Sequence, residues 1–184
     1  VPLELYDFQR DIMESVVRNR FSICKMPRQS GKTTTMVAVI LWFVLFNESF
    51  NCAILANKAG TAREILGRLQ MAYEWLPNWL QQGIVEWNKG SMELENGSKI
   101  MASSTSSSAI RGGSFSLVYL DEFAFVPPEM QEEFFASVYP TISSGRTSRV
   151  MITSTPNVMN IVHLYTSAAA HPPFLVLSEV PRIP

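Results

Sequence analysis

Residues 25–41, "KMPRQSGKTTTMVAVIL", contain the most informative motif of the chain. Its GKT tripeptide, residues 31–33, is the end of a phosphate-binding loop, whose usual form is G-x-x-x-x-G-K-[ST]. Met26 occupies the place of the first glycine of that form, and Arg28 lies inside the loop. The stretch is therefore a damaged nucleotide site, a chance match, or a variant loop with a task of its own.

The segments on either side of the loop favour a real nucleotide site. "FSICKM" (21–26) has the pattern of a short buried strand, and an apolar helix is expected from about 32 to 46. Such a strand–loop–helix unit surrounds phosphate with backbone N–H groups and a helix N-terminus. In it the Lys32 side chain reaches the β- and γ-phosphates, and the Thr33 hydroxyl is a ligand for Mg²⁺. A GKT tripeptide also occurs by chance before helices, but the flanking elements make that the weaker interpretation.

The remaining sequence predicts an α/β fold with a mostly parallel central sheet. Short apolar strands alternate with helical segments, which is typical of a sheet covered by helices on both faces. "GIVEWNKGSMELENGSKIMAS" (83–103) contains two turn signals, Asn-Lys-Gly and Glu-Asn-Gly, which predict a small antiparallel meander inserted beside the sheet. The other expected helices are 7–19, 59–76, a segment after Pro127-Pro128 and 159–168, and the other expected strands are 51–56, 115–122, 148–155 and 174–180.

Length and composition indicate a single globular domain, residues 1–184. The chain has 184 residues, of which 47% are hydrophobic and 17% are charged, so we expect a packed core. A net charge of −1 argues against a stand-alone DNA-binding module, but not against a motor that contacts DNA through a small patch. The longest apolar run, 36–46, is too short for a membrane span. Because the sequence begins without Met and stops at "EVPRIP", we expect a piece of a longer protein.

A pair of carboxylates follows another predicted strand. In "LVYLDEF" (117–123), Asp121 and Glu122 come directly after four apolar residues. The carboxyl ends of strands in α/β sheets are where ligands bind. There Asp121 is expected to hold Mg²⁺ through its water shell, and Glu122 to orient and deprotonate the attacking water. An Asp-Glu pair is also common in ordinary turns, but its presence after a GKT loop favours ATP hydrolysis.

Hydroxyl side chains end the strand that follows. In "TSTPN" (153–157), Thr153, Ser154 and Thr155 leave a predicted central strand. Such residues can hydrogen-bond both the γ-phosphate region and the Asp-Glu pair, and thereby report hydrolysis to the rest of the molecule. The alternative is a simple strand end that is broken by Pro156.

Polar residues near the N-terminus are candidates for the base of the nucleotide. Tyr6, Gln9 and Arg10 precede the strand that leads into the phosphate loop. A glutamine amide offers both the donor and the acceptor that the edge of adenine requires, and an aromatic ring or a guanidinium can stack on the base. An ordinary polar helix surface explains the same three residues equally well.

Several of these motifs together resemble a known family. In order along the chain they are "YDFQRD", "RQSGKTT", "GIVEWNKGSMELENGSKI", "AIRGGSF", "VYLDEFAFVP" and "ITSTPN". They resemble the ATPase domain of the large terminase subunit of tailed bacteriophages, nearest the myovirus type, over nearly the whole chain. In that family the phosphate loop commonly lacks its first glycine and carries an arginine. The resemblance therefore makes Met26 part of a variant loop.

The resemblance implies a P-loop NTPase of the additional-strand, catalytic-glutamate type, with ATP and Mg²⁺ as its cofactors. It also implies that Arg28 senses or stabilises the γ-phosphate from within the same subunit, and a guanidinium fork suits that charge. A solvated loop arginine is the alternative. The nucleotide-binding residues that it implies are Tyr6, Gln9, Arg10, Arg28, Gln29, Ser30, Gly31, Lys32, Thr33 and Thr34, the metal ligands are Thr33 and Asp121, the catalytic carboxylate is Glu122, and the coupling residues are Thr153, Ser154 and Thr155.

Arg111 is a further candidate, in "IRGGSF" just before the Asp-Glu strand. The two glycines that follow it permit a tight turn, which would present its side chain outward. We expect it to reach the nucleotide, in its own subunit or across a ring interface. A structural arginine that ties down a loop is the alternative.

By resemblance, the whole protein is a motor that pumps double-stranded viral DNA into a capsid in the host cell cytoplasm, at the portal vertex. The implied partners are the DNA, the portal protein, the small terminase subunit and further copies of the chain in a ring, with no membrane. Large terminase subunits normally continue into a nuclease domain with clustered acidic metal ligands. Nothing after Thr155 supplies such a cluster, so this chain is not expected to cut DNA.

Two other functions remain open. A superfamily-two helicase, or a related DNA-remodelling ATPase, shares the GKT loop, the Asp-Glu pair and a small-hydroxyl third motif. A nucleotide-dependent assembly module would bind ATP without turnover. The arginine inside the loop argues against the first, and Glu122 argues against the second.

Overall fold

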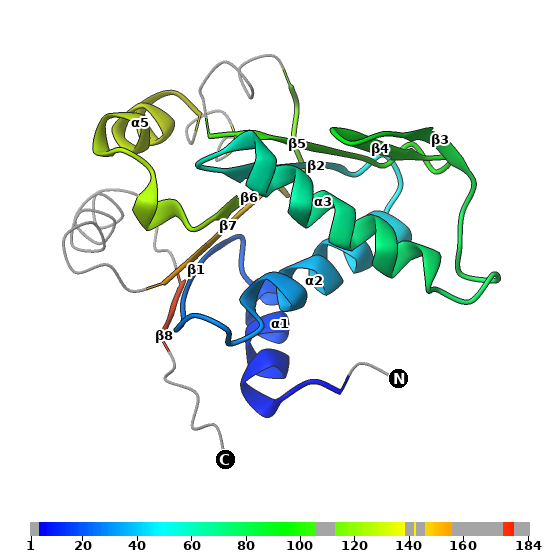
Figure 1. Cartoon of the computed structure of the whole chain (residues 1–184), viewed down its shortest axis with the longest axis horizontal. Helices are drawn as coiled ribbons and strands as arrows, with labels where there is room; N and C mark the ends of the chain where they lie inside the picture. The colour runs from blue at the N-terminus through cyan, green and yellow to red at the C-terminus, as the bar shows by residue number, and fades with distance from the viewer. Residues whose placement is uncertain (1–3, 106–112, 139–141, 143–145, 156–174, 179–184) are drawn as a thin grey trace.

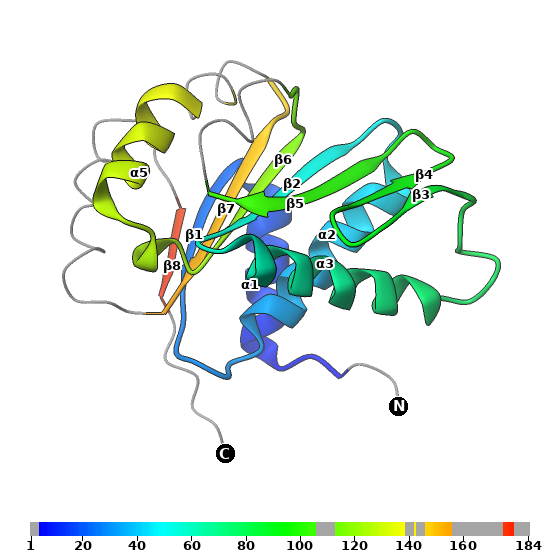
Figure 2. The ribbon, with the colours of Figure 1, turned by 45° about the horizontal axis from the view of Figure 1, so that its top comes forward.

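The computed structural model describes residues 4–105, 113–138, 142, 146–155 and 175–178, which form a sheet of eight strands with helices on both faces (Figures 1 and 2). Its helices are α1 (Asp7–Arg18), α2 (Lys32–Phe46), α3 (Ala59–Glu74) and α5 (Pro128–Glu133), with a 3-10 turn η1 (Phe123–Phe125) and a π-helical turn η2 (Phe134–Val138). Its strands are β1 (Phe21–Lys25), β2 (Asn51–Ala56), β3 (Ile84–Trp87), β4 (Ser91–Leu94), β5 (Lys99–Ser104), β6 (Leu117–Asp121), β7 (Arg149–Ser154) and β8 (Leu175–Ser178).

The order of the strands confirms the predicted fold class. They stand in the order β3-β4-β5-β2-β6-β7-β1-β8, and all pairs are parallel except β3–β4 and β4–β5. β7 lies between β1, which leads into the phosphate loop, and β6, which ends at Asp121. This intervening strand is the additional strand of the expected NTPase type. In register, Thr153 of β7 pairs with both Cys24 of β1 and Asp121 of β6, so the carboxyl ends of the three strands are level.

The predicted meander is present, but its last strand also belongs to the parallel sheet. β3, β4 and β5 pair antiparallel, as expected from the two turn signals. Asn88 closes the first turn, since its Oδ1 accepts the N–H groups of Gly90 and Ser91, each at 2.7 Å. Gly97 has a φ of 78° in the second turn, a conformation that glycine adopts without strain. β5 then runs parallel to β2, so the meander extends the central sheet.

Two hydrophobic clusters fill the two sides of the sheet. α1, α2 and α3 lie on one face, and α5 lies on the other (Figures 1 and 2). Alternate residues of a strand enter opposite clusters, because successive side chains point to opposite faces. In β6, Leu117 and Tyr119 join the cluster under α2, whereas Val118 and Leu120 join Phe123 and the start of η2. α2 is apolar around most of its surface because it packs against α1, α3 and the sheet at once.

Most element boundaries agree with the sequence to within one or two residues. The expected helix after Pro127-Pro128 is divided, since α5 ends at Glu133 and the π-helical turn η2 follows. The expected helix 159–168 lies outside the described residues. None of the described helices is both long and apolar enough to cross a bilayer.

Candidate active site

A cavity of about 700 Å³ lies at the edge of the sheet where the parallel strands end. The loop after β1, the residues after β2 and the end of β6 all contribute to its wall. This is the edge at which α/β proteins bind ligands. The cavity is lined by Arg28, Gln29, Ser30, Gly31, Lys32, Thr33, Thr34, Ala56, Asn57, Lys58, Thr61, Arg68, Asp121, Glu122 and Phe125.

The phosphate loop turns sharply just before α2. Gln29 has a φ of 60° and Gly31 a φ of 77°, so two residues of the loop are left-handed. The Ser30 hydroxyl donates to the carbonyl of Pro27 at 2.8 Å and closes the turn. Gly31 is the N-cap of α2 and brings no side chain over the first helical turn, so the N–H groups there stay open to a ligand.

Gln9 of α1 is packed directly against this loop. Its side-chain Nε2 donates to the carbonyl of Ser30 at 3.5 Å, while its Oε1 accepts the backbone N–H of Tyr6 at 3.0 Å. A Cβ placed on Gly31 would lie 2.4 Å from Gln9 Nε2, which is far inside van der Waals contact. Gln9 is therefore a buried support of the phosphate loop, a position that the expected adenine contact did not anticipate.

We expect Gly31→Ala to lower the free energy of unfolding by about 1–3 kcal/mol, because alanine is strained at a φ of 77° and its methyl group displaces Gln9. Gly67→Ala is the matched control. Gly67 lies inside α3 with no atom within 4 Å of an added Cβ, so this change should raise stability by about 0.5–1 kcal/mol. Urea unfolding followed by circular dichroism measures both. Equal stability of Gly31→Ala and the unchanged chain would contradict the described loop.

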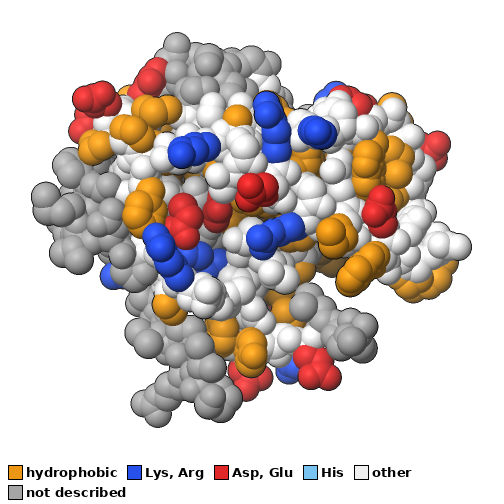
Figure 3. All heavy atoms as spheres, viewed as in Figure 1, with side chains coloured by type: hydrophobic (Ala, Val, Ile, Leu, Met, Phe, Trp, Pro, Cys, Tyr) orange, Lys and Arg blue, Asp and Glu red, His pale blue; other side chains and the backbone are white. Residues whose placement is uncertain are grey.

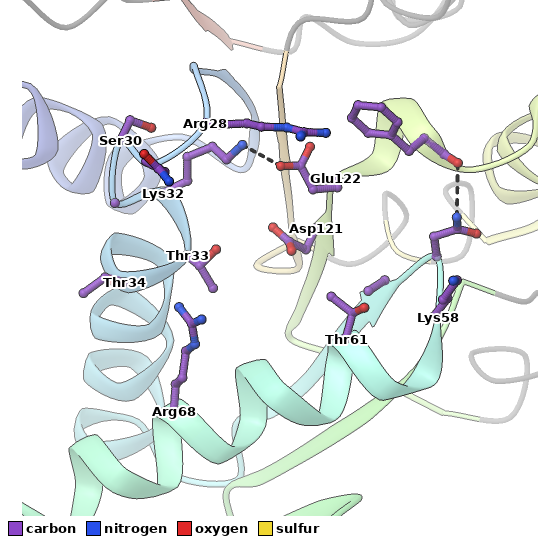
Figure 4. Close-up of a pocket in the computed structure, with 15 residues that line it drawn as sticks. Arg28, Ser30, Lys32, Thr33, Thr34, Lys58, Thr61, Arg68, Asp121 and Glu122 are labelled. Carbon is purple, nitrogen blue, oxygen red and sulfur yellow. Dashed lines mark hydrogen bonds and ion pairs between the residues drawn. The ribbon is translucent and has the colours of Figure 1, made fainter.

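Lys32 and Glu122 form an ion pair across the cavity. The Lys32 Nζ lies 2.6 Å from Glu122 Oε1, and the lysine side chain is only 7% exposed (Figure 4). The two residues are 90 positions apart, so the sheet order brings them together. Arg28 extends toward Glu122 from the same loop.

The Glu122 backbone is itself unusual. Its φ of 48° and ψ of 43° are left-handed, which is uncommon for a residue other than glycine and typical of functional sites. Glu122 Oε2 accepts the N–H and the hydroxyl of Thr155, both at 2.8 Å. Burial alone would raise the pKa of Glu122, but the hydrogen bonds from Lys32 and Thr155 outweigh it and lower this pKa below its usual value. The carboxyl group is thus held in its charged form.

Asp121 is buried at the end of β6 and bound by two hydroxyl groups. Its Oδ1 accepts the Tyr119 hydroxyl at 2.8 Å and the Thr153 hydroxyl at 2.9 Å. Burial raises the pKa of Asp121, and these two hydrogen bonds oppose that rise. Thr153 and Thr155 therefore contact the two carboxylates, as the sequence suggested. The Ser154 hydroxyl also donates to Glu122 Oε2, at 3.5 Å, and it accepts the N–H of Ala124 at 3.2 Å.

Thr33 and Asp121 fit the expected magnesium site. Both line the cavity, and Figure 4 shows them facing the same space. No hydrogen bond to Asp121 Oδ2 is present among the described residues, which leaves this oxygen for a cation. Among the described residues, there is no group of three or more His, Cys, Asp or Glu side chains that could hold a metal ion by itself. One carboxylate and one hydroxyl suit Mg²⁺, which keeps several waters and takes the remaining oxygens from phosphates.

The cavity carries more positive than negative charge. Four of its lining residues are cationic, and two, Asp121 and Glu122, are acidic. Figure 3, which has the orientation of Figure 1, shows basic and acidic side chains close together near the middle of the visible face of the molecule. The sequence had anticipated two of the cations, in the phosphate loop. Lys58 and Arg68 come from the N-cap and body of α3, and Figure 4 shows the Arg68 side chain directed toward Thr33. An excess of cations favours a polyphosphate ligand.

Other expected site residues lie away from the cavity. Tyr6 is 60% exposed and stacks on Phe8, with ring centroids 5.6 Å apart. Arg10 lies on the exposed side of α1, 4.0 Å from Asp7. Neither contributes to the cavity wall, so their adenine contacts remain predictions. Arg111 lies outside the described residues.

The sequence also matches a family of known proteins. Residues 23–169 match the family described as "Terminase large subunit, T4likevirus-type, N-terminal". Tripartite terminase subunit 3 of Equine herpesvirus 2 (strain 86/87) is 23% identical over 128 residues, which are 66% of this chain and 18% of that protein. The chain thus spans less than a fifth of the length of this relative.

Solved structures of phage terminases have a similar fold. The HK97 bacteriophage large terminase superposes with a TM-score of 0.77 at 19% identity, over 98% of this chain and 40% of that chain. The ATPase domain of the Thermus phage P74-26 large terminase gives a TM-score of 0.69 at 19% identity, covering 88% of this chain and 69% of that one. A large terminase from another thermophilic bacteriophage, solved in complex with ADP, gives a TM-score of 0.68 at 14% identity. The match covers 95% of this chain and 46% of that chain. The UvsW helicase from bacteriophage T4 is more distant, with a TM-score of 0.61 and 9% identity. The match covers 96% of this chain and 60% of that chain.

Proposed function

Because the chain belongs to the N-terminal family of T4likevirus-type terminase large subunits, we propose that it is the ATPase motor domain of a viral terminase. In this role it hydrolyses ATP to drive double-stranded DNA into a capsid. The observation that carries the proposal is the meeting of Lys32, Asp121 and Glu122 at one edge of the sheet. A cation for the outer phosphates, a metal-binding carboxylate and a second carboxylate for the water are the groups that phosphoryl transfer to water requires.

Nucleotide binding begins at the phosphate loop. The open N-terminus of α2 and the Lys32 ammonium group receive the β- and γ-phosphates, and Arg28 adds a guanidinium at the γ-phosphate. Lys58 and Arg68 supply further positive charge from α3. The nucleotide has precedent among similar folds, since the large terminase of a thermophilic bacteriophage has been solved with ADP and with ATP-gamma-S.

Hydrolysis then depends on releasing Glu122 from Lys32. Once the phosphates attract the Lys32 ammonium group, Glu122 Oε1 is free to accept a proton from water, while Thr155 still holds Oε2. The water oxygen bonds to the γ-phosphorus, the bond from the γ-phosphorus to its bridging oxygen breaks, and the proton passes to Glu122. The lowered pKa of Glu122 keeps the carboxylate charged, and therefore able to act as a base, before the reaction.

We assign the cofactor Mg²⁺ to Thr33 and Asp121, whose Oδ2 accepts no hydrogen bond from the residues that the structure describes. When bound there, the ion neutralises charge on the β- and γ-phosphates. Thr153 contacts Asp121 and Thr155 contacts Glu122, so β7 and the residue after it touch both carboxylates. This contact supports the assignment of Thr153, Ser154 and Thr155 to coupling, because the strand end senses changes at either carboxylate.

Family membership supports a proposal for the wider setting of the protein. We propose that the whole protein acts in the host cell cytoplasm, at the portal vertex of the capsid. Its partners are viral DNA, the portal protein, the small terminase subunit and other copies of itself in a ring. Arg111 is assigned to the nucleotide, in its own subunit or in a neighbouring one. A helicase is disfavoured by the more distant match to UvsW.

Phosphate release by this chain tests the proposed function. We expect hydrolysis of ATP that requires Mg²⁺, stops with EDTA, and is faster with double-stranded DNA than without it. Supercoiled plasmid serves as the DNA, so that nicking is scored in the same reactions, and we expect none. ATP bound without turnover would favour an assembly module, and nicking would contradict the expectation that this chain does not cut DNA. A folded sample that does not bind ATP would overturn the proposal.

A further inference from the structure

We propose that Tyr119 is a positioning residue whose hydroxyl group fixes the carboxylate of Asp121 for metal binding. The inference rests on the proposed function, since it concerns the same magnesium site. Tyr119 lies inside the "LVYLDEF" motif, but the sequence assigned it no role in catalysis, and it does not line the cavity. It acts on the reaction only through Asp121.

Three oxygen atoms form a closed, buried triangle at the carboxyl ends of β6 and β7. The Tyr119 hydroxyl lies 2.8 Å from Asp121 Oδ1 and 3.0 Å from Thr153 Oγ1, and Thr153 Oγ1 lies 2.9 Å from Asp121 Oδ1. Tyr119 and Thr153 are fully buried, and Asp121 is 5% exposed. Two protein hydroxyl groups therefore hold this oxygen of the carboxylate.

The two hydroxyl protons are both directed at the carboxylate. Each hydroxyl has one proton, so the pair can fill only two of the three edges of the triangle. A charged carboxylate is a stronger acceptor than a second hydroxyl. Tyr119 and Thr153 therefore both donate to Asp121 Oδ1. This fixes the rotation of the carboxyl group and leaves Oδ2 turned to other partners.

The tyrosine ring provides the rigid base for this arrangement. Tyr119 and Asp121 are two residues apart on one strand, so their side chains lie on the same face of the sheet. The ring is packed in the hydrophobic cluster under α2, while only its hydroxyl reaches the polar end of the strand. Tyr119→Phe keeps the packed ring and removes the single oxygen, so it isolates the contribution of the hydrogen bond.

Loss of this oxygen should weaken metal binding more than nucleotide binding. Partners that orient a metal ligand typically change metal affinity by about 10- to 100-fold when they are removed. We expect Tyr119→Phe to bind Mn²⁺ about tenfold more weakly in the presence of ADP, with unchanged ADP affinity in EDTA. Thr153→Val removes the other donor and should give a loss of similar size.

Tyr73→Phe is the matched control. Tyr73 is also buried, and its hydroxyl donates to the backbone carbonyl of Gln82; neither residue lines the cavity. This variant should lose some thermal stability and keep the Mn²⁺ affinity of the unchanged chain. A merely structural role of Tyr119 would give the same pattern.

Free Mn²⁺ is measured by electron paramagnetic resonance during titration of each variant with ADP present, and the melting temperature is recorded in parallel. Weaker Mn²⁺ binding by Tyr119→Phe and by Thr153→Val, with ADP binding in EDTA retained, supports the inference. Normal binding by the unchanged chain and by both variants would overturn it. If the unchanged chain itself bound no ADP, the proposed function would fail first, and the inference with it.

Discussion

Replacing Glu122 with glutamine is expected to lower kcat for ATP hydrolysis about a thousandfold, while the variant still binds ATP. The amide keeps the size of the side chain but cannot accept the proton of the attacking water. It also loses the charge that holds Lys32 Nζ at 2.6 Å. The freed ammonium group is then available to the phosphates. The slowly hydrolysed analogue ATP-gamma-S should therefore bind to the variant at least as tightly as to the unchanged chain.

Single-turnover phosphate release measures the rate, and isothermal titration calorimetry measures the affinity. Glu129→Gln is the matched control, because Glu129 is an exposed glutamate of α5 outside the cavity. It should leave both quantities unchanged. Hydrolysis by Glu122→Gln at the rate of the unchanged chain would remove Glu122 from its role as the base.

Replacing Lys32 with alanine is expected to weaken ATP-gamma-S binding by about 10- to 100-fold and to abolish hydrolysis at ordinary ATP concentrations. The change removes a charge-assisted contact to the outer phosphates. It also leaves the Glu122 carboxylate without its cation beside the phosphate site, so the two negative charges repel. The loss should be greatest for ATP-gamma-S and smallest for AMP, which lacks the phosphates that Lys32 reaches.

The double variant Lys32→Ala/Glu122→Gln separates these two causes. If Glu122 acts on nucleotide affinity through Lys32 alone, adding Glu122→Gln to the alanine variant brings no gain in affinity. If charge repulsion dominates, the double variant recovers part of the loss. Lys89→Ala, at an exposed turn between β3 and β4, is the control for removal of a lysine. Unaltered ATP-gamma-S affinity in Lys32→Ala would rule out the assigned phosphate contact.

The sequence predicted those parts of the site whose residues lie within short, local sequence patterns. The GKT loop, the Asp-Glu pair and the hydroxyl residues at 153–155 each sit beside an apolar strand, so pattern and position together indicated their place. Their convergence followed from the rule that parallel strands end at one edge. The strand order itself, with β7 between β1 and β6, was expected only by resemblance to the family.

Other parts depend on contacts between distant segments. Arg68 lies on a helix face that has the pattern of a solvated surface, and only the packing of α3 beside α2 turns it toward the cavity. Tyr119 has the pattern of a core residue, and its ring confirms that. The hydrogen bonds of its hydroxyl group could not be predicted, because they depend on Thr153, which pairs with Asp121 on the neighbouring strand. The parallel pairing of β5 was missed because turn signals specify a hairpin but not the strand on its other side.

The place of β1 in the sheet also sets the order in which the molecule can be assembled. Its neighbours among the described strands are β7 and β8, both of which come more than a hundred residues later in the chain. During synthesis, β2, β5 and β6 can pair while β1 still lacks both partners. Bringing β1 together with β7 closes a loop of more than a hundred residues, and the chain loses conformational entropy before the contacts between the strands stabilise it. We therefore expect the phosphate loop, although it is encoded among the first residues, to be among the last parts to reach its final position. A nascent chain then lacks the complete site until its sheet has formed.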